Sequence, residues 1–287
     1  MPDASQKYDL LLERLGGLGS VLVAYSGGVD STLLAVAAHA VLGDRTLAVH
    51  AVSDTCAPGE TDSARRTAAD LGLRLEEVET NELADPRFTA NPPDRCYYCK
   101  QELFDMLRTV ADARGLRYVA DGTNSDDEGD HRPGRRAAAE FGVISPLLEA
   151  GMTKQDIREV SRMLGLPNWD KLPMACLASR FPYGTTIDDA TLSRVARAED
   201  AMRALGLRHV RVRSHGDLAR LEIDPEEMER AWTNRAEVAA ALHVAGFSYS
   251  ALDLDGYRTG SLNEVLSPDD PGRAETAVPR TEPEPTR

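Results

Sequence analysis

Short apolar runs alternate with amphipathic helical patterns over the first half of the chain. After an opening helix at 4–15, residues 20–25 form a short buried strand, and a helix follows at 31–43. Further strands are expected at 46–53, 73–80 and 117–122, and helices at 60–71 and 103–115. Strands that alternate with helices predict an α/β fold with a doubly wound parallel sheet over residues 17–150, and ligands bind such sheets beyond the carboxyl ends of the strands.

A different pattern follows residue 150. A capping-type start at Thr153 opens a helix that ends at Pro167, and a loop rich in Pro, Trp, Cys and Gly comes next. Helices at 189–205 and 225–245, with strands at 209–215, 218–224 and 249–255, then predict a smaller α+β module. The expected divisions are an α/β domain at 1–166, a linking loop at 167–188, a small α+β domain at 189–266 and a proline-rich disordered tail at 267–287.

The charge of the chain limits the classes of partner. With 33 basic and 47 acidic residues, the formal net charge is −14, which disfavours a surface that grips the backbone of a nucleic acid. No apolar run approaches the roughly 20 residues that a membrane helix needs, and the first residues lack a signal-peptide pattern. We therefore expect a cytoplasmic protein with neither a nucleic-acid nor a membrane partner.

The strongest local signal is the run S-G-G-V-D-S at 26–31, where the first strand turns into a helix. Backbone N–H groups and the positive helix end face one point there, which suits a polyphosphate. No Lys follows the glycines as in the Walker pattern, so the loop favours pyrophosphate over a kinase-type clamp. The structural alternative is a tight strand-to-helix turn. The stretch D-G-T-N at 121–124 ends another strand on the same side, where an Asx-type turn and a ligand contact are equally open.

The four cysteines, Cys56, Cys96, Cys99 and Cys176, are too few for a disulfide framework in a chain of 287 residues. Cys96 and Cys99 have C-x-x-C spacing just before a predicted helix, whose end lowers the pKa of a thiol. With Cys176 they offer three soft ligands. These could hold zinc with one further ligand, hold an iron–sulfur cluster in which one iron lacks a thiolate, or simply fill buried space. Cys56 is interpreted as a small buried residue.

Three arginines form a candidate anion site. Arg211 and Arg213 alternate along the strand 209–215 and so lie on one face of it, and Arg180 comes from the linking loop. In an acidic chain such a cluster can bind a phosphate group bidentately. A solvated charged strand face is the alternative.

The run at 26–31 resembles the phosphate loop of the PP-loop ATP pyrophosphatases. These enzymes split ATP into AMP and pyrophosphate while they adenylate a carboxylate or carbonyl oxygen. The resemblance implies that the ATP phosphates are cradled by Ser26, Gly27, Gly28, Asp30, Ser31 and Thr32. It also implies that Asp30 helps to hold Mg²⁺, and that the end of the second strand, 50–53 with Ser53, lies beside adenine or ribose.

A longer series of motifs follows in order from Arg95 onward: R-C-Y-Y-C-K-x-x-L-F, D-G-T-N-x-D-D-x-x-D-x-R-P-G-R-R-A, S-P-L-x-E-A-G-M-T-K, L-P-x-W-D-K, A-C-L-A-S-R-x-P-Y-G, V-R-V-R-x-H-G-x-x-A-R-L-E and L-D-L-D-G-Y-R-T-G-S-L-N-E. Together they resemble the LarE family, ATP-dependent sulfur transferases that help to build the nickel-pincer nucleotide of lactate racemase. The resemblance that they carry covers about residues 8–266. The resemblance implies that ATP adenylates pyridinium-3,5-biscarboxylic acid mononucleotide and that sulfur then enters as a thiocarboxylate.

The same resemblance gives the cysteines and arginines their roles. Cys176 matches the sulfur-donating cysteine, which in one branch gives up its own sulfur and becomes dehydroalanine. In another branch three cysteines hold a [4Fe-4S] cluster that carries an extra sulfide. Because Cys96 and Cys99 are both present, we favour the cluster branch, which needs a source of sulfide. The resemblance also implies a homo-oligomer, with a hexamer as one form.

The proposed substrate site contains the arginine cluster. Arg180, Arg211 and Arg213 would bind the substrate phosphate by this resemblance, with Glu199 and Glu222 nearby or engaged in structural ion pairs; Tyr97 would stack on the pyridinium ring or pack in the core. The alternatives are an amidating synthetase of the same fold, a tRNA thiolase, and a nucleotide or iron–sulfur sensor without catalysis. Pyrophosphate release that depends on the biscarboxylate would distinguish an enzyme from a sensor.

Overall fold

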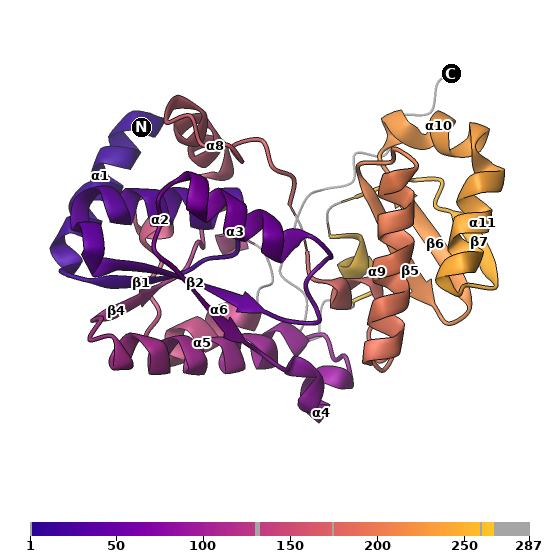
Figure 1. Ribbon diagram of the computed structural model, residues 1–287, viewed down its shortest axis with the longest axis horizontal. Coiled ribbons are helices and arrows are strands. Elements are labelled where there is room, and N and C mark those ends of the chain that lie inside the picture. The colour runs from indigo at the N-terminus through magenta and orange to yellow at the C-terminus, as the bar shows by residue number, and fades with distance from the viewer. Residues whose placement is uncertain (1, 130–132, 174, 259, 267–287) are drawn as a thin grey trace, which may run out of the picture.

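The computed structural model describes residues 2–129, 133–173, 175–258 and 260–266, and contains two separate sheets (Figure 1). Each sheet has its own helices and its own apolar core. The tail predicted at 267–287 lies outside the described residues, and the predicted boundaries at 166 and 188 stay predictions. Within the described residues, none of the helices is both long and apolar enough to cross a membrane.

The first sheet has four parallel strands in the order β3-β2-β1-β4. The strands are β1 (Val21–Ala24), β2 (Thr46–Val52), β3 (Leu75–Glu79) and β4 (Tyr118–Ala120). The chain moves outward from β1 to β3 and then returns to the far side of β1. The direction of winding therefore reverses between β1 and β4, and the residues after these two strands form the crevice in which such sheets bind ligands.

Helices cover both faces of this sheet (Figure 1). One face carries α1 (Ala4–Leu18), α2 (Val29–Leu42), α3 (Glu60–Asp70) and α8 (Lys154–Met163); the other carries α5 (Arg95–Ala113) and α6 (Pro133–Glu140). In β1, Val21 and Val23 pack toward the first group of helices, whereas Leu22 packs toward the second. A strand buried on both faces is apolar throughout, which is why β1 appears in the sequence as a continuous hydrophobic run.

The second sheet has the order β5-β6-β7, with β5 and β6 antiparallel and β7 parallel to β6. Its elements are α9 (Asp189–Ala204), β5 (Val210–His215), β6 (Leu218–Ile223), α10 (Met228–Thr233), α11 (Arg235–Ala245) and β7 (Tyr249–Leu252). Val210 and Val212 pack with the helices in one core. Because strand side chains alternate, Arg211 and Arg213 lie on the opposite face.

Short elements complete the described chain. They are the helices α4 (Pro86–Thr89) and α7 (Pro146–Glu149) and the 3₁₀ turns Gly43–Arg45, Glu82–Ala84, Ser125–Gly129, Leu177–Arg180, Pro225–Glu227 and Ser261–Val265. The α/β class and its parallel sheet were predicted correctly. The helix predicted at 103–115 begins earlier, at Arg95, so Cys96 and Cys99 lie inside its first two turns and not before it.

Asn91 joins the segment before α5 to the linking loop. Its side chain is buried, and its Nδ2 donates to the Pro182 carbonyl at 2.8 Å, while its Oδ1 accepts from Nη1 of the buried Arg95 at 2.9 Å. Its main-chain carbonyl accepts from the amide of Gly184. Asn91 has φ of 54°, in the left-handed region that asparagine tolerates better than most residues.

We expect Asn91→Gly to lower the free energy of unfolding by about 2–4 kcal/mol, because it leaves buried polar groups without partners. Asn91→Ala should be less stable still. In Asn91→Ala, a Cβ in the left-handed region costs about 1–2 kcal/mol. In Asn91→Gly, the greater entropy of the unfolded chain costs only about 0.4–1 kcal/mol. Guanidinium unfolding of the two variants tests this, and equal stability of Asn91→Gly and the unchanged protein would contradict it.

Candidate active site

The phosphate loop connects β1 to α2 and depends on one close contact. Gly27 has φ of +72°, and a Cβ added there would lie 2.7 Å from the Cβ of Ala64 in α3. Gly28 is the N-cap of α2. Only glycine combines this backbone conformation with this approach to a neighbouring helix. The result is a tight loop that aims the unpaired N–H groups of the first turn of α2 outward.

Two hydroxyl groups close this loop. The Ser31 Oγ lies 3.2 Å from the Ser26 amide and 3.0 Å from the Ser26 Oγ, and the amide of Gly28 donates to the Ser26 Oγ at 3.3 Å. These bonds hold the loop in its conformation through the chain's own groups. A helix N-terminus with a preformed loop of this kind is suited to binding an anion.

Asp30 lies in the first turn of α2 and is paired with Lys154, whose Nζ is 2.6 and 2.5 Å from the two carboxylate oxygens. Burial raises the pKa of Asp30, and Lys154 offsets this only in part. Lys154 follows the N-cap Thr153 of α8, where the predicted capping box is present. The role of Lys154 was not predicted, because only the fold brings it to Asp30.

The turn at 121–124 lies against the same loop. A Cβ added at Gly122 would be 3.2 Å from the Ser31 amide nitrogen and 3.3 Å from the Asp30 Cβ. The turn also has the Asx-type bond expected of it, from the Thr123 amide to Asp121 at 3.2 Å. The segment is therefore an Asx turn that borders the phosphate loop, and its contact with a ligand stays a prediction.

The linking loop also contacts the phosphate loop, through Asn168 and Lys171. The Asn168 Nδ2 donates to the Gly27 carbonyl at 3.1 Å and to the Thr32 Oγ1 at 2.9 Å. The Lys171 Nζ is 3.3 Å from the same carbonyl and 2.9 Å from Glu60. Lys171 adds a positive charge at the site where phosphates are expected. The L-P-x-W-D-K run contributed to the family resemblance, but no role was predicted for its lysine.

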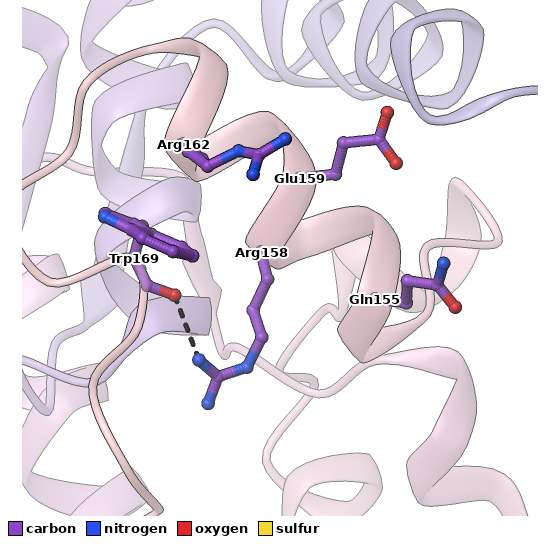
Figure 2. Close-up of a pocket in the computed structure, with 5 residues that line it drawn as sticks. All are labelled: Gln155, Arg158, Glu159, Arg162 and Trp169. Atoms are coloured by element: carbon purple, nitrogen blue, oxygen red, sulfur yellow. Dashed lines mark hydrogen bonds between the residues drawn. The ribbon is translucent and has the colours of Figure 1, made fainter.

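A surface hollow of about 620 Å³ lies between helix α8 and the linking loop. It is lined by Gln155, Arg158, Glu159, Arg162 and Trp169 (Figure 2). It contains none of the predicted site residues. Arg158 donates to the carbonyls of Trp169 at 3.0 Å and Lys171 at 2.8 Å. The arginine therefore supports the linking loop from outside.

Ser53 follows the end of β2, as predicted, but its hydroxyl group is engaged. It donates to Glu82 at 2.6 Å and lies 2.9 Å from the Thr55 Oγ1. His50, earlier in β2, is buried with its Nδ1 2.9 Å from the Tyr25 carbonyl. Contact of Ser53 with adenine or ribose stays a prediction.

The cysteines come from three segments. Cys99 lies 3.7 Å from Glu82, and burial raises its pKa well above the ordinary value, with Glu82, Cys176 and Cys96 close enough to add to the shift. Burial also raises the pKa of Cys56, where Glu82 and Cys176 contribute again. Cys56 was predicted to be a small buried residue, yet it is partly exposed and lies in the neighbourhood of Cys176. The amide of Leu177 donates to the Thr55 carbonyl at 2.8 Å, joining the two segments.

The fit of a metal cluster rests on the chemistry of these donors. Three thiols suit iron or zinc. As they stand, no three Cys, His, Asp or Glu side chains among the described residues form a group that could hold a metal ion. Cys96 and Cys176 are exposed and come from separate segments, α5 and the linking loop. The donor set therefore fits the cluster, while its arrangement is not that of a closed metal site.

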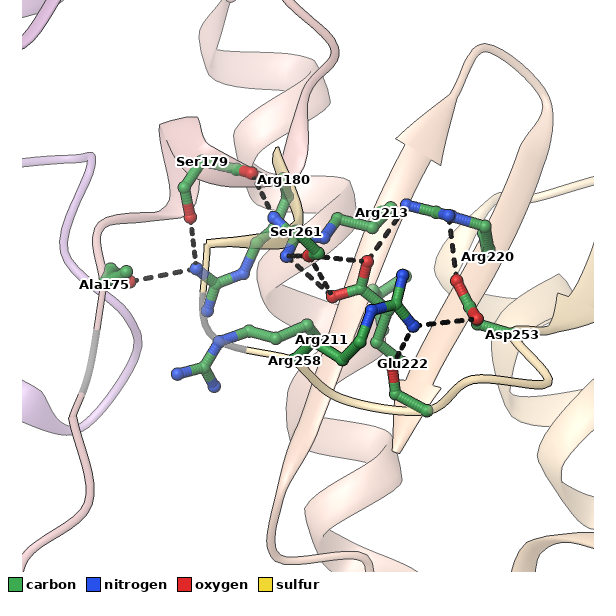
Figure 3. A network of polar contacts seen from close by, with 12 residues as sticks. Ala175, Ser179, Arg180, Arg211, Arg213, Arg220, Glu222, Asp253, Arg258 and Ser261 are labelled. Carbon is green, nitrogen blue, oxygen red and sulfur yellow. Dashed lines mark hydrogen bonds and ion pairs between the residues drawn. The ribbon is translucent and has the colours of Figure 1, made fainter. Parts of the chain in front are cut away.

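Arg180 is fully buried and forms a bidentate pair with the equally buried Glu199, at 2.7 and 3.1 Å (Figure 3 shows the surrounding network). Burial alone would raise the pKa of Glu199, but Arg180 outweighs it and the pKa lies below its usual value. The remaining nitrogen of Arg180 donates to the carbonyls of Ala175 and Cys176. Binding of substrate phosphate by Arg180 stays a prediction.

Arg211 and Arg213 lie beside it on β5. The Arg213 Nη2 donates to Glu222 at 2.6 Å and to Ser261 at 2.8 Å (Figure 3). Arg211 donates to the Pro173 carbonyl at 2.8 Å. Burial and the neighbouring Arg180 lower the pKa of Arg211. The structure thus brings the three predicted arginines together.

Tyr97 lies elsewhere, half-buried between α5 and α6. Its hydroxyl group donates to Glu140 at 2.6 Å, and the guanidinium carbon of Arg136 is 3.7 Å from the centre of its ring. Stacking on a substrate ring stays a prediction.

The parallel sheet, its winding reversal at β1 and the S-G-G-V-D-S loop at the start of α2 define a PP-loop ATP-utilising enzyme. Comparison with known proteins agrees: a glutamine-hydrolysing GMP synthase chain of Archaeoglobus fulgidus is 27% identical over 159 residues, 52% of this chain and 52% of that protein. This likeness covers about half of each chain. No protein-family model matches the chain.

Two relatives match nearly the whole chain. An uncharacterized protein of Synechocystis is 47% identical over 263 residues, 91% of this chain and 98% of the relative. The pyridinium-3,5-bisthiocarboxylic acid mononucleotide synthase of Lactiplantibacillus plantarum is 38% identical over 268 residues, 93% of this chain and 97% of the relative. The chain belongs to the LarE family, whose members are ATP-dependent sulfurtransferases.

The contact between Gly27 and Ala64 gives a prediction for ATP binding. Gly27→Ala should reduce ATP affinity at least tenfold, because a Cβ would force the loop away from α3 and out of its positive-φ conformation. Gly16→Ala in α1 is the control, because a Cβ added there would meet nothing within 4 Å and Gly16 does not have a positive φ. Isothermal titration calorimetry measures both, and equal losses in the two variants would count against this role of Gly27.

Proposed function

We propose that the protein uses ATP to adenylate pyridinium-3,5-biscarboxylic acid mononucleotide and then inserts sulfur to give the thiocarboxylate, a step of nickel-pincer nucleotide biosynthesis. The observation that carries this proposal is the path of the linking loop. Asn168 and Lys171 contact the phosphate loop, Arg180 belongs to the arginine cluster, and Cys176 lies between them. The name of the Lactiplantibacillus relative gives its product, a bisthiocarboxylic acid mononucleotide, which combines thiocarboxyl groups with a nucleotide phosphate.

The chemistry follows from these positions. A substrate carboxylate attacks the α-phosphorus of ATP, and pyrophosphate leaves toward the amides of the phosphate loop. A sulfur nucleophile then attacks the acyl adenylate, and AMP leaves with the bonding electrons. Lys171 can neutralise charge on the phosphates, and Asp30 would hold Mg²⁺, which supplies further charge neutralisation when bound. Holding Mg²⁺ requires Asp30 to share or exchange its contact with Lys154.

For the sulfur, we propose that Cys96, Cys99 and Cys176 hold a [4Fe-4S] cluster, which when bound supplies a sulfide from an external source. The alternative is that Cys176 donates its own sulfur. We further propose a cytoplasmic homo-oligomer, with a hexamer as one form. Support for assembly comes from exposed apolar side chains close together in the chain: Met163, Leu164, Trp169 and Leu172.

Asp30→Asn tests the adenylation step. AMP formation that depends on the biscarboxylate nucleotide should fall by roughly 100-fold or more, since the variant removes the charge that organises Mg²⁺ at the start of α2. Asp44→Asn, an exposed carboxylate beyond the other end of α2, should leave the rate unchanged. The measurement is chromatographic quantification of AMP with and without the nucleotide. Near-normal AMP formation by Asp30→Asn would refute the assignment.

Cysteine variants test the source of sulfur. Cys96→Ser and Cys99→Ser should lose both iron and repeated turnover with added sulfide, whereas Cys56→Ser should retain iron in anaerobically purified protein. Iron analysis and intact-protein mass after reaction measure this. A mass loss of about 34 Da from Cys176, the mass of H₂S, would show that the cysteine is consumed and would overturn the cluster proposal.

A further inference from the structure

The three buried arginines also hold the backbone that carries Cys176. We define the Cys176 loop as residues 175–179. The Arg180 Nη1 donates to the carbonyls of Ala175 at 3.0 Å and Cys176 at 3.1 Å, and the Arg213 Nη1 donates to the carbonyl of Ser179 (Figure 3). Just before the loop, the Pro173 carbonyl accepts from Arg211. The position of Cys176 therefore depends on guanidinium groups that are also the predicted phosphate ligands.

Arg180 is a fixed member of this set. Two of its nitrogens are bonded to Glu199, and both side chains are fully buried. Exchanging Glu199 for a ligand would leave a carboxylate buried without its partner, which costs more than one new hydrogen bond returns. Arg180 therefore keeps the Ala175 and Cys176 carbonyls, at the start of the Cys176 loop, anchored.

Arg211 and Arg213 differ because their bonding is incomplete. In the described part of the chain, Arg211 has hydrogen bonds only to the Val210 and Pro173 carbonyls, and no carboxylate forms an ion pair with it. The Nε of Arg213 is buried without a hydrogen-bond partner there. Three buried arginine charges thus face only two buried glutamates, Glu199 and Glu222. An uncompensated cation and an unpaired donor at one place point to an anionic ligand.

A phosphate group cannot reach these two guanidiniums as they are covered now. Arg211 is 8% exposed and Arg213 is 7% exposed. Part of their cover is the segment whose Pro173 and Ser179 carbonyls they bind. A phosphate oxygen accepts a stronger, charge-assisted hydrogen bond than a neutral carbonyl does, so exchange of these partners is favourable.

We propose that the phosphate group of the nucleotide substrate displaces the Pro173 and Ser179 carbonyls from Arg211 and Arg213, and so releases the Cys176 loop while Arg180 keeps it anchored. The proposal rests on the proposed function, because it takes the phosphorylated substrate from there. Arg211 and Arg213 are then positioning residues for Cys176 as well as ligands of the phosphate. The Cys176 loop, which would deliver the sulfur, is then released only while a substrate is bound.

Hydrogen–deuterium exchange of the full-length protein tests this, with its iron content recorded and inorganic phosphate as the probe against chloride of equal ionic strength. Most ligands slow exchange where they bind. Here saturating phosphate should speed exchange of the amides of 175–179 by about tenfold, the factor that one lost hydrogen bond is worth. The relevant amides include that of Leu177, which donates to Thr55, and that of Ser179, which donates to Cys176.

Variants separate release from a general effect of phosphate. In Arg211→Gln and Arg213→Gln, the amides of 175–179 should exchange fast even without phosphate, and added phosphate should not speed their exchange further. Arg194→Gln is the matched control, because Arg194 donates to the Gly216 carbonyl and the Ser214 hydroxyl group of the same module and not to the Cys176 loop. It should behave like the unchanged protein. Circular dichroism melts of all three variants check that each is folded.

Slower or unchanged exchange of 175–179 at saturating phosphate would overturn the proposal, and so would calorimetry that detects no phosphate binding. The proposed function is tested separately by AMP formation. If phosphate binds without freeing the loop and AMP still forms with the biscarboxylate nucleotide, the release fails and the proposed function stands. If the loop is released by phosphate but no AMP forms with that nucleotide, the release stands and the proposed substrate fails.

Discussion

The buried pair of Arg180 and Glu199 is the interaction on which the site depends. Removing both charges from water costs several kcal/mol per ion, and only good geometry with every remaining donor satisfied offsets that cost. The geometry meets the first condition, and each nitrogen of Arg180 has at least one acceptor. The pair is bidentate, the last nitrogen of Arg180 binds the Ala175 and Cys176 carbonyls, and Glu199 also accepts from the amide of Val212 at 3.1 Å. Helix α9, strand β5 and the Cys176 loop therefore meet at one carboxylate.

The other end of the linking loop is fixed at the phosphate loop, where Asn168 binds Gly27 and Thr32. Cys176 thus lies on a short stretch of chain held at both ends, by the phosphate loop before it and by the arginine cluster after it. Holding two reactants in one place replaces a bimolecular encounter with an intramolecular one. In the proposed reaction, this arrangement would let a chain with two separate sheets bring both reactants to Cys176.

Features formed by residues that are neighbours in the sequence could be predicted from the sequence alone. The phosphate loop could be predicted because strand, glycines and helix follow one another directly, and burial of β1 on both faces leaves a plain apolar run. The contacts of Lys154 with Asp30 and of Lys171 with Gly27 could not be predicted from the sequence, because each contact joins residues more than a hundred positions apart. The early start of α5 at Arg95 was missed for a related reason. Packing of its first turns against the rest of the fold overrides the weak helical preference of Cys and Tyr.

Charge and burial together indicate what size of anion this site admits. The chain carries a formal charge of −14, yet three arginines are buried in one cluster. Exposed charges are screened by salt within about 8–10 Å, whereas buried charges act at nearly full strength. A long polyanion would lie along the outside of a chain whose net charge is −14 and would gain little from cations buried beneath it. A single phosphate on a small molecule can enter the cluster once the Pro173 and Ser179 carbonyls are displaced, so this distribution of charge favours a mononucleotide over a nucleic acid.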